Sequence, residues 1–264
     1  MKAYFESNKL STGAVGVYNL EDARLHSYQT NDPMTDVVTV VEKAGRGVVI
    51  DPPSFHSNIK ELTDYLNSQN IKIDGVVFSY HMAGASFLPD VKKYSTKKAD
   101  DFARNGHGKV MVADFAKDFG VAFDPNLPVI NDFIKDSQIT IGGIDLNIVN
   151  TSDAFDIEIP TINSFYTHML GHDTHSIIAS TALAQEMIEQ LDGFLDKGYR
   201  LVLSGHHIPE DSHDVESKIH YLDKLIAVAG SSESAGEFKN SMKKLYPDFK
   251  GENYLDMTAS FLFP

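Results

Sequence analysis

Short apolar runs bounded by turn residues fill the first third of the chain and predict strands. Residues 2–7, 13–20, 35–43 and 45–53 each combine β-branched or aromatic residues with the length of an ordinary strand. The last two runs meet at Ala44–Gly45, which is typical of a hairpin turn. The pattern therefore predicts a sheet that begins with antiparallel neighbours.

A helix followed by a buried strand comes next. Asn58 and Glu61 have the spacing of a capping box, and the apolar positions after Asn58 recur at helical intervals, at Ile59, Leu62 and Leu66. Residues 73–80, "IDGVVFSY", then form an apolar run typical of a buried strand. Strand, helix and strand within this distance indicate a βαβ-like unit and an α/β architecture.

The remaining chain mixes strands with helices. Residues 109–115, "KVMVADF", predict a strand, Gly142–Gly143 predicts a hairpin, and residues 156–169 predict two strands broken at Pro160. Residues 199–205, "YRLVLSG", predict a further strand. Helices follow from apolar residues at helical spacing, at Leu183, Met187, Leu191 and Leu195, at Val215, Ile219, Leu222 and Leu225, and at Phe238, Met242 and Leu245. No linker or repeat interrupts the pattern, so a single domain over residues 1–264 is expected.

Composition narrows the classes of protein. The chain has 264 residues, 42% hydrophobic residues, no cysteine and a formal net charge of −14. The absence of cysteine excludes disulfides, thiolate metal sites and cysteine nucleophiles. An acidic chain without a basic run is not expected to bind nucleic acid or an anionic membrane. With neither a signal peptide nor an apolar run of membrane-spanning length, a soluble cytoplasmic protein is expected.

Histidines gather after two of the predicted strands. The stretch "YTHMLGHDTHS" carries His168, His172, Asp173 and His175, and "LVLSGHHIPED" carries His206, His207, Glu210 and Asp211. Imidazole with carboxylate is the donor set that a borderline divalent metal prefers. The alternative is that these side chains are solvated or cap backbone groups in polar loops. A serine hydrolase is disfavoured because no G-x-S-x-G elbow is present, and "AGRG" and "IGGID" lack the phosphate-loop pattern.

The order of these segments resembles the metallo-β-lactamase superfamily. The opening unit is "GRGVVIDPPSFHSNIKELTDYLNSQNIKIDGVVFSYHMAGAS", the middle strands are "ITIGGIDLNIVNTSDAFDIEIPTINSFYTHMLG", and the closing unit is "LVLSGHHIPEDSHDVESKIHYLDKLI". The likeness spans roughly Lys2 to Leu225. It implies an α/β (α+β) fold, the four-layer αβ/βα sandwich, with a dinuclear metal site at one edge of two packed sheets.

The ligand positions that the resemblance implies are mostly replaced. On "YHMAGA", the positions of the family's H-x-H-x-D-H motif hold Tyr80, Met82, Gly84 and Ala85. The family's lone metal histidine falls near Ala154 and its bridging aspartate near Met169, whereas the final histidine is present as His206. A dinuclear site needs several imidazoles and a bridging carboxylate, so that site is not expected here.

Two functions stay open from the sequence. The first is a divergent metal-dependent hydrolase of an unidentified small substrate, with a shifted or mononuclear site. Its expected metal ligands are His81, His172, Asp173, His175 and His206, with Asp173 and His206 as the catalytic residues. The expected cofactor is one divalent metal, zinc before manganese or iron. The second is a catalytically inactive descendant that binds a small molecule or a protein, with no metal. An oligomer is compatible with both.

Overall fold

The computed structural model describes residues 4–263. The chain forms two compact units. The first comprises residues 1–169 and 203–209, and the second comprises residues 170–202 and 210–264. The single domain over residues 1–264 stays a prediction. Among the residues described, no helix has both the length and the apolar character that crossing a membrane requires.

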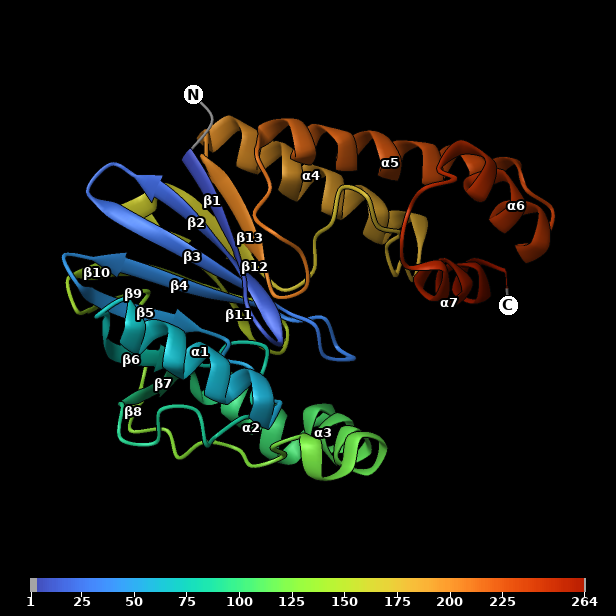
Figure 1. Ribbon diagram of the computed structural model, residues 1–264. Helices are drawn as coiled ribbons and strands as arrows, with labels where there is room; N and C mark the ends of the chain where they lie inside the picture. The colour runs from blue at the N-terminus through green and yellow to red at the C-terminus, as the bar shows by residue number, and fades with distance from the viewer. Residues whose placement is uncertain (1–3, 264) are drawn as a thin grey trace. The chain divides into compact units, whose positions relative to one another are not determined.

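The first unit contains an eight-stranded sheet in the sequential order β1 to β8 (Figure 1). Neighbours from β1 to β5 are antiparallel, and those from β5 to β8 are parallel. The change of direction after β5 follows from the intervening helix, which returns the chain to start β6 beside β5. The strands are β1 (Tyr4–Lys9), β2 (Gly13–Leu20), β3 (Ala23–Thr30), β4 (Val37–Lys43), β5 (Arg46–Ile50), β6 (Lys72–Val77), β7 (Lys93–Ser95) and β8 (Asp132–Phe133).

A second sheet has five strands in the order β13-β12-β11-β10-β9. The predicted hairpin at Gly142–Gly143 is confirmed, because it joins β9 to β10, and a 3-10 helix at Pro160 separates β11 from β12. The strands are β9 (Gln138–Ile141), β10 (Ile144–Asn150), β11 (Phe155–Ile159), β12 (Ser164–Thr167) and β13 (Leu201–Ser204). Their inward positions are apolar: Leu146, Ile157 and Phe155 are fully buried.

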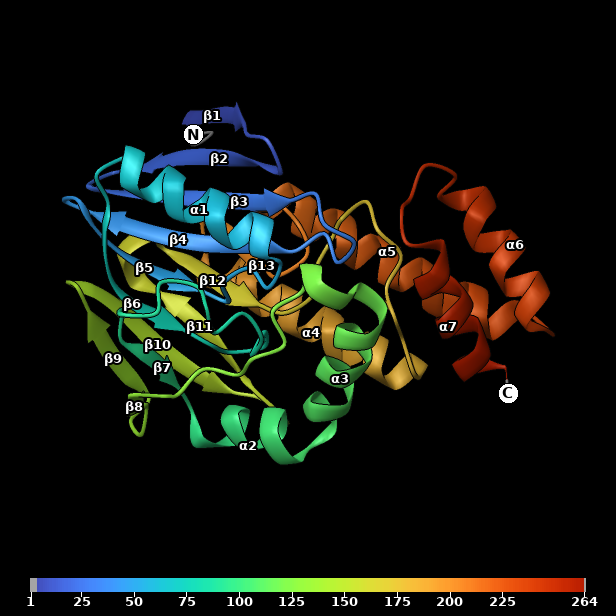
Figure 2. The ribbon, with the colours of Figure 1, turned by 60° about the horizontal axis from the view of Figure 1, so that its bottom comes forward.

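Helix α1 (His56–Ser68) packs on the first sheet, and its Leu62 and Leu66 join a core with Val40 and Val76 of the strands (Figure 2). The predicted capping box is wrong. The helix begins at His56, and Asn58 is buried inside it, where its amide donates to the Tyr28 hydroxyl at 2.8 Å. The Tyr28 hydroxyl in turn donates to Glu61 at 2.9 Å. Both polar side chains therefore tie the helix to the sheet instead of capping it.

Residues 109–115 form a helix and not the predicted strand. Helix α2 (Lys97–Asn105) is followed by α3 (His107–Phe119), and a 3-10 turn, η1 (Gly120–Ala122), closes the segment. The apolar residues of the segment fit a helical face at least as well as a strand, because Val112, Phe115, Ala116 and Phe119 recur at helical spacing.

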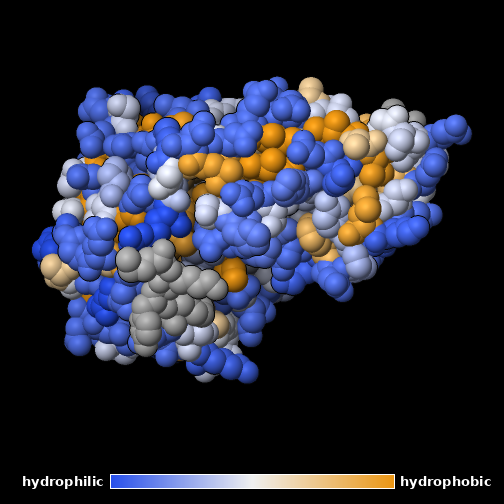
Figure 3. Space-filling view, turned by 90° about the horizontal axis from the view of Figure 1, so that it is seen from above, coloured by the Kyte–Doolittle hydropathy of each residue, from blue (hydrophilic) through white to orange (hydrophobic). Residues whose placement is uncertain are grey.

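The second unit is mostly helical. It contains α4 (Thr181–Lys197), α5 (Ser212–Ser231), α6 (Ala235–Leu245) and α7 (Glu252–Leu262), and of these α7 was not expected from the sequence. Helices α4 and α5 lie side by side, and their buried residues Ile188, Leu191, Leu222 and Leu225 are the predicted apolar positions or their neighbours. The view in Figure 3 shows a mainly hydrophilic surface with some apolar side chains among the polar ones, as a charge of −14 leads one to expect.

Candidate metal centre

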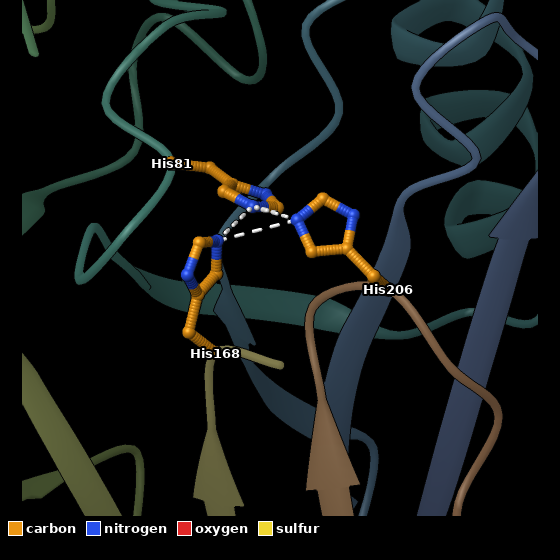
Figure 4. A group of neighbouring side chains, drawn as sticks. All are labelled: His81, His168 and His206. Carbon is orange, nitrogen blue, oxygen red and sulfur yellow. Dashed lines mark hydrogen bonds between the residues drawn. The ribbon is translucent and has the colours of Figure 1, made fainter. Parts of the chain in front are cut away.

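Three histidines meet in the first unit, each from the loop after a strand. His81 follows β6, His168 follows β12 directly, and His206 follows β13. Their rings point at one another (Figure 4). The Nε2 atom of His81 lies 3.3 Å from Nε2 of His168 and 3.2 Å from Nε2 of His206, and the third pair is 3.2 Å apart. These residues form the histidine cluster.

Main-chain hydrogen bonds fix the loops that carry the cluster. The amide of Gly205 donates to the carbonyl of His168 at 2.9 Å, and its carbonyl accepts the amide of Val37 at 2.7 Å. A Cβ on Gly205 would lie 3.0 Å from Cε1 of His81. The glycine therefore lets the β13 loop approach closely enough for all three rings to converge.

A buried carboxylate supports the loop that carries His81. Asp51 ends the strand β5 with φ of 48°, an uncommon conformation for a non-glycine residue. It accepts the amide of Ser79 at 2.6 Å and the hydroxyl of Tyr166 at 2.7 Å. Asp51 thus joins the loop before His81 to the strand before His168.

The tyrosine beside His81 also orients the cluster. The Tyr80 ring stacks on His168 with centroids 4.6 Å apart and an interplanar angle of 6°. Its hydroxyl donates to Asp156 at 2.7 Å. Burial and the Asp156 carboxylate raise the pKa of Tyr80 far above its usual value, so the phenol stays protonated and acts as a donor.

All three imidazoles are neutral at pH 7. Burial lowers the pKa of His81, lowers that of His206 to about 4, and lowers that of His168 well below its usual value, and the neighbouring rings add to the effect for His168 and His206. A neutral imidazole carries one N–H and one lone pair. Each ring therefore has a lone pair to offer, which is the state that binds a metal.

A buried acidic residue, Asp36, lies beside the histidine cluster. Oδ1 of Asp36 lies 3.4 Å from Nδ1 of His206, and Asp36 is 2% exposed. Burial raises the pKa of Asp36 to about 7, against the opposing effect of His206. A carboxylate beside the outer nitrogen of a histidine is the usual arrangement behind a metal-binding imidazole.

The donor set fits a single tetrahedral cation. Zinc–nitrogen bonds of about 2.0–2.1 Å at tetrahedral angles separate ligand nitrogens by about 3.3–3.4 Å, close to the spacing of the cluster. Without a cation, at least one of the three Nε2 pairs cannot be a hydrogen bond, because each neutral Nε2 either donates or accepts and two of the three must be in the same state. Three histidines with an open fourth position are a known catalytic zinc set.

The replaced family positions now have a structural explanation. Gly84 has φ of 85°, and a Cβ there would lie 2.5 Å from the carbonyl oxygen of Pro53. No aspartate fits at that position without a change of the backbone. Met82 is 5% exposed and Ala154 is 4% exposed, so both pack in the interior.

The sequence-predicted ligands divide into two sets. His81 and His206 lie in the cluster. His172, Asp173 and His175 belong to the second unit, and each has a partner there. Both the amide and Nδ1 of His172 contact Oε1 of Glu210, at 2.6 and 3.0 Å, Asp173 pairs with Lys250 at 3.0 Å, and Nδ1 of His175 lies 3.1 Å from the Tyr221 hydroxyl.

His168 is the cluster member absent from the predicted ligands. Its signal in the sequence was its place directly after the apolar strand "SFYT", just as His206 follows "LVLSG". His172, Asp173 and His175 lie further along the chain, in the loop beyond that position, and stay a prediction as metal ligands.

Known structures identify the fold. No family model matches the chain, and neither does any curated protein. The stereoselective inverting sec-alkylsulfatase Pisa1 from Pseudomonas sp. has a TM-score of 0.60 at 15% identity over 90% of this chain and 48% of its own. Its double mutant has a TM-score of 0.64 at 14% identity, over 93% of this chain and 49% of that one. The chain thus spans about half the length of these sulfatase chains.

Two shorter structures match over most of their own length. A metallo-β-lactamase from Erythrobacter litoralis has a TM-score of 0.57 at 14% identity, covering 83% of this chain and 100% of that one. A metallo-β-lactamase family protein from Thermus thermophilus has a TM-score of 0.56 at 13% identity and 92% coverage of both chains. The protein therefore has the metallo-β-lactamase fold, the αβ/βα sandwich that the sequence predicts. Its histidine cluster follows three strands of that fold.

Proposed function

We propose that the protein is a metal-dependent hydrolase of a small substrate, with one divalent metal held by His81, His168 and His206. The observation that carries the proposal is the triangle of Nε2 atoms, 3.2–3.3 Å on each side. Zinc is the expected ion because neutral imidazoles are its common ligands, with manganese or iron as alternatives. Hydrolase-type neighbours share the fold.

A metal held by three histidines would activate water or polarise a substrate oxygen. The protein's own groups do the positioning. The Met34 backbone hydrogen-bonds the His206 ring, Oδ1 of Asp36 lies 3.4 Å from Nδ1 of that ring, and the Tyr80 ring stacks on His168. Asp32, 8% exposed and electrostatically coupled to His81, has a buried Oδ2 without a hydrogen-bond partner. It is a candidate for accepting a proton, as is Asp36, whose Oδ1 also lacks a hydrogen-bond partner, because a general base needs a carboxylate oxygen that is not already engaged.

Metal content measured on untagged protein tests this function. We expect about one equivalent of zinc by elemental analysis, lost in the His168→Ala variant and kept in the His172→Ala and His175→Ala variants. The last two are matched controls, since each removes a histidine that the sequence, but not the cluster, assigns to the metal. Loss of zinc in His172→Ala with retention in His168→Ala would refute the ligand assignment.

The alternative function, a catalytically inactive binding protein, is distinguished by the same preparation. Stoichiometric zinc with hydrolysis of generic esters, sulfate esters or lactams that disappears in His168→Ala supports the enzyme. Protein that takes up no zinc, manganese or iron after chelation and readdition would refute a metal-dependent activity and favour the binding protein.

A further inference from the structure

His81 depends on its loop more than the other two residues of the histidine cluster do. Strand β6 ends at Val77, so His81 lies farther from its strand than His168 does from β12 or His206 from β13 (Figure 4). Asp51 holds the part of the loop that precedes His81. The position of the ring therefore also depends on what holds the residues that follow it.

A second buried carboxylate holds the loop after His81. Asp124 is 0% exposed, and its Oδ2 accepts the amide of Ser86 at 2.8 Å. The carbonyl of Asp124 accepts the amide of Gly84 at 3.0 Å, and the carbonyl of Asn126 accepts the next amide along the loop at 3.1 Å. Three consecutive amides after His81 thus donate to one short segment of the chain.

This segment is itself anchored. The amide of Asp124 donates to the carbonyl of Ser54 at 2.7 Å, and the preceding Phe123 pairs with Phe55 in an antiparallel bridge. Phe123 is 2% exposed and belongs to one buried apolar cluster with Phe55 and Ala83. Because its own backbone is fixed, Asp124 can fix the loop that donates to it.

The charge of Asp124 adds to its hold on the loop. Burial alone would raise the pKa of Asp124, but the hydrogen bonds from Ser86 and Asn126 lower it, so the group is ionised at pH 7. A hydrogen bond to a carboxylate is roughly twice as strong as one between neutral groups. Loss of this charge should therefore loosen the loop even where the shape of the side chain is kept.

We propose that Asp124 is a positioning residue, which holds the loop of His81 so that its ring meets those of His168 and His206. The effect on metal binding rests on the proposed function, whereas the positions of the three rings do not require a metal. The role also links the histidine cluster to α2 and α3, because the chain passes from α3 through η1 directly into this segment.

Histidine-ring NMR of the metal-free protein tests the position of His81 without requiring activity. The ring signal reports a displacement because the rings of His168 and His206 lie close by, at centroid distances of 5.3 and 4.8 Å from His81. The spectrum of a His81→Gln variant assigns the signal. We expect the His81 signal to move in Asp124→Asn, which loses the charge, and to move further in Asp124→Ala, which loses both carboxylate acceptors.

Glu42→Gln and Glu42→Ala are the matched controls. Glu42 is 4% exposed, and its carboxylate also accepts a backbone amide, that of Gly45 at 2.5 Å. It lies at the end of β4 opposite to Asp36, away from the histidine cluster. Urea denaturation compares the stability of the four variants, so that an effect of lost stability is separated from an effect on His81.

Zinc affinity, measured by chelator competition, gives the consequence for the proposed function. Relative to the Glu42 controls, it should fall about tenfold in Asp124→Asn and further in Asp124→Ala, as for other residues that orient a metal ligand from outside.

The outcomes separate this role from the proposed function. A His81 signal that moves in the Asp124 variants and not in the Glu42 controls supports the role, even if the wild type binds no zinc and the proposed function fails. A signal that moves no further than in the controls overturns the role, and the proposed function stands if the wild type binds zinc. Unchanged zinc affinity in both Asp124 variants of a protein that binds zinc also overturns it.

Discussion

The buried histidine of the first sheet gives a quantitative prediction about stability in acid. His26 lies on β3 and is 0% exposed, and its Nδ1 is 2.8 Å from the Tyr65 hydroxyl. Its Nε2 is buried without a hydrogen-bond partner. Burial lowers the pKa of His26 from 6.5 to about 4, with a smaller contribution from Arg24. The ring is therefore neutral in the folded protein under conditions that protonate it in the unfolded chain.

The sign and size of the effect follow from proton binding. Between pH 6.5 and about 4 the unfolded chain holds more protons at this residue, so the free energy of unfolding falls as the pH falls. With these two pKa values, His26 alone lowers the free energy of unfolding by roughly 2 kcal/mol between pH 7 and pH 5. That is a large share of the 5–15 kcal/mol or so by which folded domains are stable.

Urea denaturation of wild type and a His26→Gln variant at pH 7 and pH 5 measures this contribution. Each protein is compared with itself at the two pH values, so any constant cost of the substitution cancels. We expect the decrease on acidification to be about 2 kcal/mol smaller in His26→Gln than in wild type. His220→Gln, at an exposed position of α5, is the control and should follow wild type. Equal decreases in wild type and His26→Gln would refute the assignment of the effect to burial at His26.

Three further substitutions have outcomes set by local geometry. Gly205→Ala places a Cβ 3.0 Å from Cε1 of His81, so zinc affinity in a chelator competition should fall about tenfold or more. The far-ultraviolet circular dichroism should stay unchanged. Unaltered zinc affinity would mean that the loop tolerates the methyl group. Gly84→Asp places the residue of the family motif at this position. It should lower the free energy of unfolding by at least about 2 kcal/mol, because φ is 85° and the Cβ would meet the Pro53 carbonyl oxygen at 2.5 Å. A stable variant with a second bound metal would contradict this. Lys218→Met removes an ammonium that donates to the carbonyls of Gly171 and Thr174, at 2.8 and 2.7 Å. Hydrogen exchange should therefore rise in residues 171–175, and the free energy of unfolding measured with urea should fall by about 2–4 kcal/mol. Unchanged exchange there would show that the loop does not need the lysine.

The sequence predicted most strands because their apolar residues alternate or run together between turn residues. The hairpin at Gly142–Gly143 required only local chemistry, since both glycines have positive φ. The strand predicted at residues 109–115 was wrong because the local sequence was not sufficient there. "KVMVADF" has the β-branched residues of a strand, and only the positions that follow it, Ala116 and Phe119, complete a helical face. Seven residues were too short a window to decide between the two periods.

The site was harder to predict because it depends on which strand ends lie together. His81, His168 and His206 are separated by 87 and 38 positions, and no local spacing links them. The order β13-β12 in the second sheet places the loops of His168 and His206 side by side. The compact group "HMLGHDTH" looked like the better metal site, yet His172 and His175 use a ring nitrogen on Glu210 and Tyr221.

In this chain the hydrogen bonds that hold the loops involve different residues from those at the ligand positions that the resemblance implies. Asp51 directly follows β5 and fixes the loop after β6 by accepting the amides of Ser79 and Tyr80. In that loop the donor is His81, one position after the family's first ligand position, and His168 lies one position before the place where the bridging aspartate was expected. A shift by one residue redirects a side chain on an extended segment, so the three imidazoles converge on one point, and Gly84 excludes a carboxylate ligand at its position. This geometry favours one cation over two, which is why we expect a mononuclear centre where the resemblance of the sequence implied a dinuclear one.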